Sequence, residues 1–359
     1  MDQRTLFIPG PTWVDPAARL AMSADMIGHR SPAFSELVAI SQPILKEMAG
    51  TIRPMYLATC SSWGMMEACL RNLVRPGKRV LNCCNGAFSD RWHDVSLRCG
   101  LQADALRTDW GTPIDPASVT QALASHTYDL VTLVHAETST GVLNPLKKIA
   151  EIVNRYPGTL LAVDTVSSYS ATPLMMDAWG IDVMLAGTQK ALALPPGLTV
   201  CAVSERALSR AGEVPGRGFY MDFLEYEKNA CRDMTISTPA IPLIMGLAHR
   251  AREINAEGVK TRFERHRRCR RFVSAWAEKH GFTPVPPRGF RADTLNCLIP
   301  PEEMDTVVFA QRLKQNYGWV IDAGYGKWKS RRIRISNMGV LSTEDIIPLL
   351  NDMEECLIL

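Results

Sequence analysis

The sequence predicts an α/β fold: a large domain with a mostly parallel sheet flanked by helices, and a smaller α+β domain at the carboxyl end. From about residue 50 to 205, short apolar runs alternate with longer segments of helical period, the pattern of parallel strands joined by crossover helices. After Arg217 the helical segments lengthen and the strand-like runs become fewer. The 359 residues are 46% hydrophobic and 21% charged, which excludes a disordered or fibrous protein.

The elements of the first region follow from the positions of its apolar runs. Two of the expected helices begin with proline, whose missing N–H costs nothing in a first helical turn. We expect strands at Arg79–Cys84, Leu130–His135, Thr159–Asp164, Asp182–Gly187 and Leu198–Val203, and helices at Met65–Val74, Arg91–Cys99, Pro116–Ala124 and Pro145–Tyr156.

The carboxyl part begins with two long helices, and a proline-rich turn at Pro284–Gly289 follows them. Because no long flexible linker is visible, we expect the two parts to pack together. The division expected is a segment at 1–20, a large domain at 21–250 and a small domain at 251–359. The long helices are expected at Ala240–Asn255 and Val259–Lys279, shorter ones at Asp305–Asn316 and Thr343–Ile358, and strands at Thr294–Ile299, Trp319–Ile321 and Arg332–Ser336.

Charge and cysteine usage favour small molecules as partners and the cytoplasm as location. The formal net charge of +3 is too small to indicate nucleic acid as a partner, and we interpret the basic run Lys260–Arg271 as a solvated helix face. Scattered cysteines and the seven histidines show no metal-ligand spacing, so no metal is expected. Neither a signal peptide at Met1–Pro11 nor a membrane-spanning stretch is visible, which predicts a soluble protein.

An acid and a lysine follow two neighbouring strands of the expected sheet. Asp164 ends one strand, and Lys190 comes just after the next, between the polar turn Gly187–Gln189 and the apolar segment Ala191–Gly197. Ligands of such sheets bind outside the carboxyl ends of the strands, so both side chains are expected in one crevice. A lysine in apolar surroundings and a carboxylate suit pyridoxal phosphate, whose aldehyde needs an amine and whose ring nitrogen needs an acid. Taken alone, each residue is also common on a protein surface.

Three further segments place polar or aromatic groups at the same sheet edge. Thr59–Gly64 precedes a helix, where hydroxyl groups and backbone N–H groups form an anion site or, more simply, a helix cap. Asn85–Phe88 brings an aromatic ring, which also fits a core position. His135–Gly141 adds hydroxyl groups directly after a buried strand. Their convergence favours a ligand site.

Several recognisable short motifs follow one another along nearly the whole chain. They are Pro9–Pro11, Met26–Pro32, Asn85–Phe88, Glu137–Gly141, Val163–Ser168, Gly187–Lys190 with Pro195–Gly197, and Arg334–Gly339. In this order they resemble the class V, fold type I pyridoxal-phosphate aminotransferases, in particular the alanine–glyoxylate and serine–glyoxylate aminotransferase group. The resemblance implies transfer of an amino group from alanine, serine or a similar amino acid to glyoxylate or pyruvate, with the cofactor in the large domain.

The resemblance also implies a role for each matching residue. Lys190 would be the catalytic residue, which forms the Schiff base and moves the proton, and Asp164 would hold the pyridine nitrogen. The ring would lie between Phe88 and Val166, with Ser139 facing its phenolate oxygen. The phosphate would lie against Ser61, Ser62, Trp63 and Gln189, with Thr238 of a second subunit, which implies a homodimer with shared sites.

On the substrate side, Arg334 matches the arginine that binds the α-carboxylate, although it also stands in a basic run typical of a surface. Gly10 and His29 match elements near the substrate, and the segment around His29 also fits a dimer-interface loop. Two departures affect the phosphate site: Ser61–Trp63 replaces a glycine-rich turn of many relatives, and Thr235 stands where some have tyrosine.

Other activities remain open at this point. 2-Aminoethylphosphonate–pyruvate transamination fits the pattern of Glu137–Gly141 with Asn144 and Pro145. A cysteine desulfurase-like lyase needs an exposed nucleophilic cysteine, whereas Cys297 falls in an expected strand. A binding protein that kept the fold without activity is the remaining class.

Overall fold

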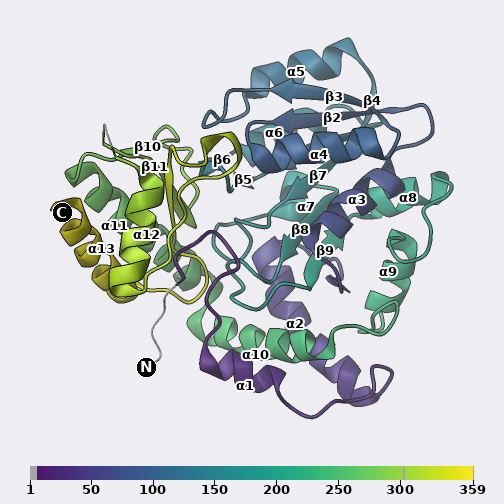
Figure 1. The fold of residues 1–359 in the computed structure, drawn as a ribbon. Coiled ribbons are helices and arrows are strands. Elements are labelled where there is room, and N and C mark those ends of the chain that lie inside the picture. The colour runs from purple at the N-terminus through teal and green to yellow at the C-terminus, as the bar shows by residue number, and fades with distance from the viewer. Residues whose placement is uncertain (1–5, 302–303, 359) are drawn as a thin grey trace.

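A computed structural model describes residues 6–301 and 304–358 (Figure 1). Its centre is a seven-stranded sheet in the order β1-β9-β8-β7-β4-β2-β3, in which the neighbours from β8 to β3 are parallel. The strands β1 and β9 at one side each run antiparallel to the next strand. The strands are β1 (Tyr56–Ala58), β2 (Arg79–Cys84), β3 (Gln102–Arg107), β4 (Tyr128–Val134), β7 (Leu160–Asp164), β8 (Val183–Gly187) and β9 (Thr199–Val203).

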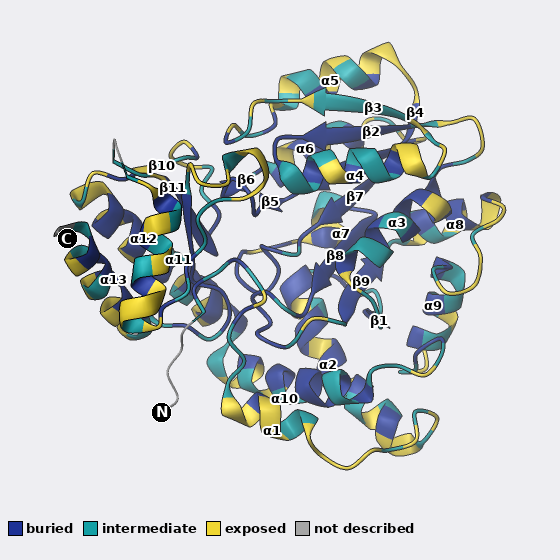
Figure 2. Cartoon of the chain, in the orientation of Figure 1, coloured by how far each residue is buried: buried dark blue, intermediate teal, exposed yellow. Residues whose placement is uncertain are grey.

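Helices cover both faces of this sheet, so its central strands are buried on each side and form the dark band of Figure 2. Along β4, for example, Val131 and Leu133 point into one core and Leu130 and Val134 into the other. One core includes side chains of α2 (Pro32–Ala49), α5 (Pro116–Ser125), α6 (Leu146–Val153), α7 (Met176–Trp179) and α10 (Ile241–Glu257), and α1 (Pro16–Met22) packs on α10. The other core includes α3 (Ser62–Leu73), α4 (Ala87–Arg98), α8 (Glu205–Glu213) and α9 (Phe223–Ala230).

The carboxyl-terminal elements form a second body beside the hairpin of β5 (Ala136–Glu137) and β6 (Val142–Leu143), at the left of Figure 1. Its own core includes Phe7 from the amino-terminal segment. The antiparallel sheet β10-β11-β12 packs there with helices. Its elements are α11 (Val259–Lys279), β10 (Thr283–Pro284), β11 (Leu295–Ile299), α12 (Thr306–Tyr317), a 3-10 turn (Gly326–Trp328), β12 (Ile333–Ser336) and α13 (Thr343–Ile358).

The five strands expected in the large sheet are present, with ends shifted by at most two residues. The strand expected at Trp319–Ile321 is wrong, because only isolated bridges form there, from Val320 to Leu6 and from Asp322 to Arg334. The expectation of a solvated helix face for Lys260–Arg271 is wrong at Arg262, whose side chain is only 2% exposed. The domain boundaries at residues 20 and 250 stay predictions. Within the described ranges, no helix combines the length and the apolar character needed to cross a bilayer.

Candidate active site

The amine of Lys190 lies buried between the two bodies of the chain, in the turn that follows β8. Its Nζ donates a hydrogen bond to the carbonyl oxygen of Pro9 and lies 6.0 Å from the centre of the Phe88 ring. Burial lowers the pKa of Lys190 to about 8, and the positive charge of Arg334 adds to this effect. Nearby carboxylates oppose the shift. A neutral amine, the nucleophilic form, is therefore accessible near physiological pH.

Gly10 leaves the space that the Lys190 side chain fills. A β-carbon added at Gly10 would lie 2.9 Å from both Cδ and Cε of Lys190, and the φ of +105° at Gly10 disfavours any other residue. Thr12 holds the same turn from the backbone side, since its Oγ1 donates to the carbonyl oxygen of Lys190 at 3.0 Å. The amino-terminal segment thus helps to fix the lysine.

Asp164 ends β7 and is 5% exposed. Burial raises the pKa of its carboxyl group to about 7, and the backbone N–H of Val166, 2.7 Å from Oδ1, opposes that shift. The charges of Asp164 and Lys190 each influence the pKa of the other, so the two groups share one site as the sequence predicts. Val166 itself is half-buried beside Asp164.

The start of α3 and the turn before Lys190 form a polar cradle. Ser62 is buried, and its Oγ is without a hydrogen-bond partner among the described residues. A β-carbon at Gly187 would lie 2.7 Å from this Oγ and would also collide with the Gln189 side chain, so only glycine leaves the space between them open. Ser61, the N-cap residue, is exposed and makes no capping hydrogen bond with its side chain. Unpaired donors at the start of a helix suit an anion such as a phosphate group.

Glu137 is a fully buried carboxylate that organises the opposite wall. Its Oε1 accepts from Ser139 Oγ at 2.6 Å, and its Oε2 accepts from the N–H of Ser89 at 3.0 Å. Ser139 Oγ in turn accepts from the N–H of Ala87 at 2.9 Å. The one proton of the Ser139 hydroxyl is therefore committed to Glu137, and its Oγ faces the start of α4, which carries Phe88. Glu137 lies within the motif Glu137–Gly141, whose pattern alone indicates no role for it.

Arg334 extends from β12 into the same region and is 4% exposed. Its Nε donates to Asp322 Oδ1 at 2.8 Å, and its Nη1 donates to the carbonyl oxygen of Thr138 at 2.9 Å. These contacts fix the plane of the guanidinium group, whose charge reaches Lys190. The surface position that a basic run suggests is therefore wrong for this arginine.

Tyr325, which the sequence analysis missed, covers the site from the loop before β12. Its ring stacks on Phe88 with the centroids 5.4 Å apart, and it lies 5.2 Å from the Arg334 guanidinium carbon. Together with Trp63 and Phe88 it lines a hollow of about 570 Å³. No local pattern marks this residue, because its partners come from other parts of the chain.

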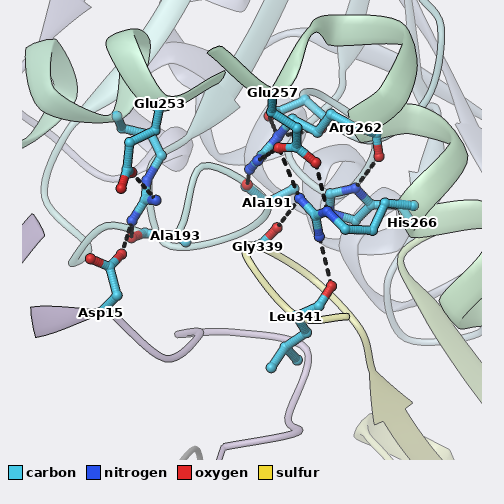
Figure 3. A network of polar contacts seen from close by, with 12 residues as sticks. Asp15, Ala191, Ala193, Glu253, Glu257, Arg262, His266, Gly339 and Leu341 are labelled. Atoms are coloured by element: carbon cyan, nitrogen blue, oxygen red, sulfur yellow. Dashed lines mark hydrogen bonds and ion pairs between the residues drawn. The ribbon is translucent and has the colours of Figure 1, made fainter. Parts of the chain in front are cut away.

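Buried arginines hold the backbone that follows Lys190 (Figure 3). Arg262 of α11 donates to the carbonyl oxygen of Ala191 at 2.5 Å, and Arg250 of α10 donates to that of Ala193 at 3.2 Å. Carboxylates balance both charges: Glu257 pairs with Arg262, while Asp15 and Glu253 pair with Arg250. With His249, Asp15 and Glu253 form a group of potential metal ligands in the described residues. Because Arg250 already forms ion pairs with both acids, we assign no metal to this group.

The segment expected to reach a second subunit lies beside His29 of its own chain. Thr238 Oγ1 is 3.5 Å from His29 Nε2, and Arg30 Nη1 is 3.5 Å from the carbonyl oxygen of Thr235. Thr238 is exposed, whereas Thr235 is buried and donates from Oγ1 to the carbonyl oxygen of Ser237. Thr238 and His29 thus form one small patch apart from the contacts of Lys190 described above.

Comparison with known proteins shows what the chain resembles. Residues 58–279 match the family model described as aminotransferase class V. A Synechococcus protein named soluble hydrogenase, small subunit, is 31% identical over 99% of this chain and 93% of its own length. The serine–glyoxylate aminotransferase of Methylorubrum extorquens is 30% identical over 98% of this chain and 90% of its own. The crystal structure of alanine–glyoxylate aminotransferase from Nostoc sp. superposes with a TM-score of 0.94 at 29% identity, covering 99% of this chain and 96% of that one.

Proposed function

The chain belongs to the aminotransferase class V family, and we propose that it transfers the amino group of a small amino acid to glyoxylate, with pyridoxal phosphate as its cofactor. The observation that carries the proposal is the convergence of a buried lysine, a buried aspartate and a buried arginine on one site. The serine–glyoxylate and alanine–glyoxylate aminotransferases described above, which the chain resembles over nearly their whole length, are named for glyoxylate, which supports this acceptor.

The residues present fit the cofactor. The unpartnered Ser62 Oγ and the start of α3 would hold the phosphate, with Gln189, Ser61, Trp63 and a partner subunit's copy of the Thr238 segment around it. Phe88 and Val166 would contact the ring, and Asp164 would hold its nitrogen. When bound, pyridoxal phosphate supplies an aldehyde that condenses with amines and a ring that accepts the electron pair released at the substrate α-carbon.

Lys190 would do the proton chemistry. Because burial brings the pKa of this amine to about 8, it can accept a proton from the substrate α-carbon. It would then return the proton at C4′ of the cofactor. The hydrogen bond to Pro9 and the fit against Gly10 fix the direction of the side chain. Asp164 would keep its proton or share it with the ring nitrogen, since its pKa of about 7 makes both forms accessible.

Arg334 would bind the α-carboxylate of donor and acceptor alike. Its Nε and Nη1 are already held by Asp322 and Thr138, so a substrate meets a guanidinium group of fixed orientation. Tyr325 lies against the same guanidinium group and limits the room beyond it. This arrangement supports a small substrate side chain, and Gly10 and His29 would stand near it.

The proposal includes a homodimer with shared sites in the cytoplasm. The exposed Thr238 patch supports the dimer, because it offers hydroxyl and imidazole groups to a neighbouring subunit rather than to its own lysine. The ten cysteines, all free, support a reducing compartment.

The experiment is a donor panel with the purified, cofactor-loaded protein. Alanine, serine, aspartate and 2-aminoethylphosphonate are offered with glyoxylate or pyruvate, and the amino acid formed is measured by chromatography. We expect glycine from glyoxylate with a small α-amino acid as donor. Lys190→Ala should lose both this activity and the visible absorption of the loaded protein, whereas Lys148→Ala, at an exposed position, should keep both. Glycine formation by Lys190→Ala at the wild-type rate would refute the proposal, and a marked preference for the phosphonate would overturn the substrate assignment.

A further inference from the structure

An unassigned hollow of about 460 Å³ lies between α11 and the loop that follows β10. Five arginines line it: Arg267, Arg270 and Arg271 from the helix, and Arg288 and Arg291 from the loop. We call this set the arginine pocket. The helix arginines belong to the basic run that the sequence analysis assigned to solvent, and the proposed transamination uses none of them.

The charges in the arginine pocket are poorly balanced. Only two carboxylates, Asp293 and Glu278, line it with the five arginines. The surplus of three positive charges in this one hollow is as large as the formal net charge of the entire chain, +3. Clustered charge of one sign raises the local concentration of counter-ions and favours a ligand of opposite charge.

Close internal partners are found for only one of these arginines in the described part of the chain: Arg291 donates from Nη1 to Glu278 Oε1 at 3.1 Å and from Nε to the carbonyl oxygen of Pro286 at 3.3 Å. Asp293 lies 3.7 Å from Arg267 and 3.6 Å from Arg270, so both contacts are long. The buried Nε of Arg270 is without a hydrogen-bond acceptor. In the described part of the chain, no ion pair or hydrogen bond is found for the side chains of Arg271 and Arg288.

The crowding of positive charges affects the pKa of Arg270. Burial lowers the pKa of its guanidinium group, and the neighbouring charges of Arg271 and Arg291 lower it further, while Asp293 opposes both effects. Guanidinium groups bind phosphate and carboxylate oxygens through paired N–H donors. An anion with several such oxygens would supply the missing acceptors and relieve the repulsion together.

We propose that the arginine pocket binds a small polyanion that carries at least two phosphate or carboxylate groups. The pocket has room for such a ligand between helix and loop, and its side chains come from both. A neighbouring groove along α11 shares Arg267 and Arg271 with the arginine pocket, so a single-stranded oligonucleotide is included in the test as the competing ligand.

The loop of the arginine pocket is also joined to the wall of the candidate active site. The N–H of Leu143 donates to the carbonyl oxygen of Phe290 at 2.7 Å, and the N–H of Ala292 donates to that of Gly141 at 2.9 Å. The hairpin so held contains Glu137. A bound polyanion would therefore lie at the junction between the two bodies of the chain.

The test is calorimetric titration of the cofactor-loaded, full-length protein with inorganic pyrophosphate, and separately with citrate, at about 0.15 M salt. Loading with pyridoxal phosphate fills the phosphate cradle, and the double variant below separates binding in the arginine pocket from binding at Arg334. We expect saturable binding of one ligand per chain. The double variant Arg271→Ala/Arg288→Ala should weaken it by at least about tenfold, because each arginine contributes charge-assisted hydrogen bonds.

Arg268→Ala is the matched control, since this exposed arginine lies on the same helix and lines only the neighbouring groove. It should leave the affinity within about threefold of wild type. Both altered positions of the double variant are exposed, and an unchanged melting temperature will show that the fold is intact. Binding of pyrophosphate alone or citrate alone identifies a phosphate or a carboxylate ligand. The absence of saturable heat with both, an equal loss in the control, or tighter binding of a single-stranded oligonucleotide would each overturn the inference.

Discussion

Replacing Arg262 by methionine should destabilise the protein strongly, although the residue stands in a run of sequence that looks like surface. Its guanidinium group is 2% exposed and donates to Ser170 Oγ at 2.8 Å, to Glu257 Oε2 at 2.8 Å and to the carbonyl oxygen of Ala191 at 2.5 Å. Methionine fills much of the volume but donates nothing. The buried oxygens at Ser170 and Ala191 would lose this donor, while Glu257 would keep Arg265 as a partner.

Removing one partner of a buried, hydrogen-bonded ion pair costs about 3–5 kcal/mol. We expect about 4 kcal/mol, since Arg265 still compensates the charge of Glu257. Unfolding entropy is about 2.1 cal/mol/K per residue, so a chain of 359 residues changes its melting temperature by about 1 °C for each 0.75 kcal/mol. The expected loss is therefore about 5 °C, measured by circular dichroism during heating.

Two further variants make the result specific. Arg262→Lys keeps the charge beside Glu257 but cannot reach all three partners, so it should lose roughly half as much. Arg268→Met removes an exposed arginine of the same helix and should cost less than about 0.5 kcal/mol. If Arg262→Met melts within about a degree of Arg268→Met, the buried hydrogen bonds of Arg262 do not stabilise the fold.

Further predictions concern the site itself. In the cofactor-free protein, burial raises the pKa of Asp164 to about 7 from 3.8, so the native state keeps a proton that the unfolded state releases. The free energy of unfolding of wild type minus that of Asp164→Asn should fall by about 3 kcal/mol as pH rises from about 4 to 7 in denaturant titrations; a flat difference would contradict the shift. Tyr325→Ala should raise kcat/KM for a bulky donor relative to alanine by about tenfold, while Tyr325→Phe, which keeps the stacked ring, should not. Ser62→Ala should weaken binding of pyridoxal phosphate by about tenfold or more in fluorescence titrations, and Ser125→Ala, at an exposed position, should leave it unchanged. Cysteine should yield no sulfide above the level of free cofactor, because Cys297 is buried in β11 and its thiol pKa is raised to about 12.

The sequence was sufficient for the five inner strands of the large sheet, β2, β4, β7, β8 and β9, because strands buried on both faces are continuous apolar runs with little ambiguity. It was insufficient for β3, an edge strand whose partly exposed residues alternate without a strong pattern. It was also insufficient at Trp319–Ile321, where apolar residues pack into the core of the carboxyl part without a strand.

For the site, local pattern located Asp164 and Lys190, since both follow strands of one sheet and the edge of that sheet brings them together. It could not locate Tyr325 or the Asp322 partner of Arg334, because contacts across the chain give these residues their positions. The sequence did not predict the burial of Arg250 and Arg262 for a different reason. An arginine is expected at the surface unless its buried hydrogen-bond acceptors are known.

The hydrogen bonds from α10 and α11 to the backbone after Lys190 restrict how this enzyme can be re-engineered. Exchange of the carboxyl part for that of a relative would replace Arg262 and the Gly339 loop. Because Arg262 donates to Ala191 and the Gly339 loop packs against Ala193, the turn that carries Lys190 would be held less firmly. A chimera therefore has to take Arg250 and Arg262 from the same parent as their acceptors at Ala193 and Ala191, even where other residues determine its new specificity.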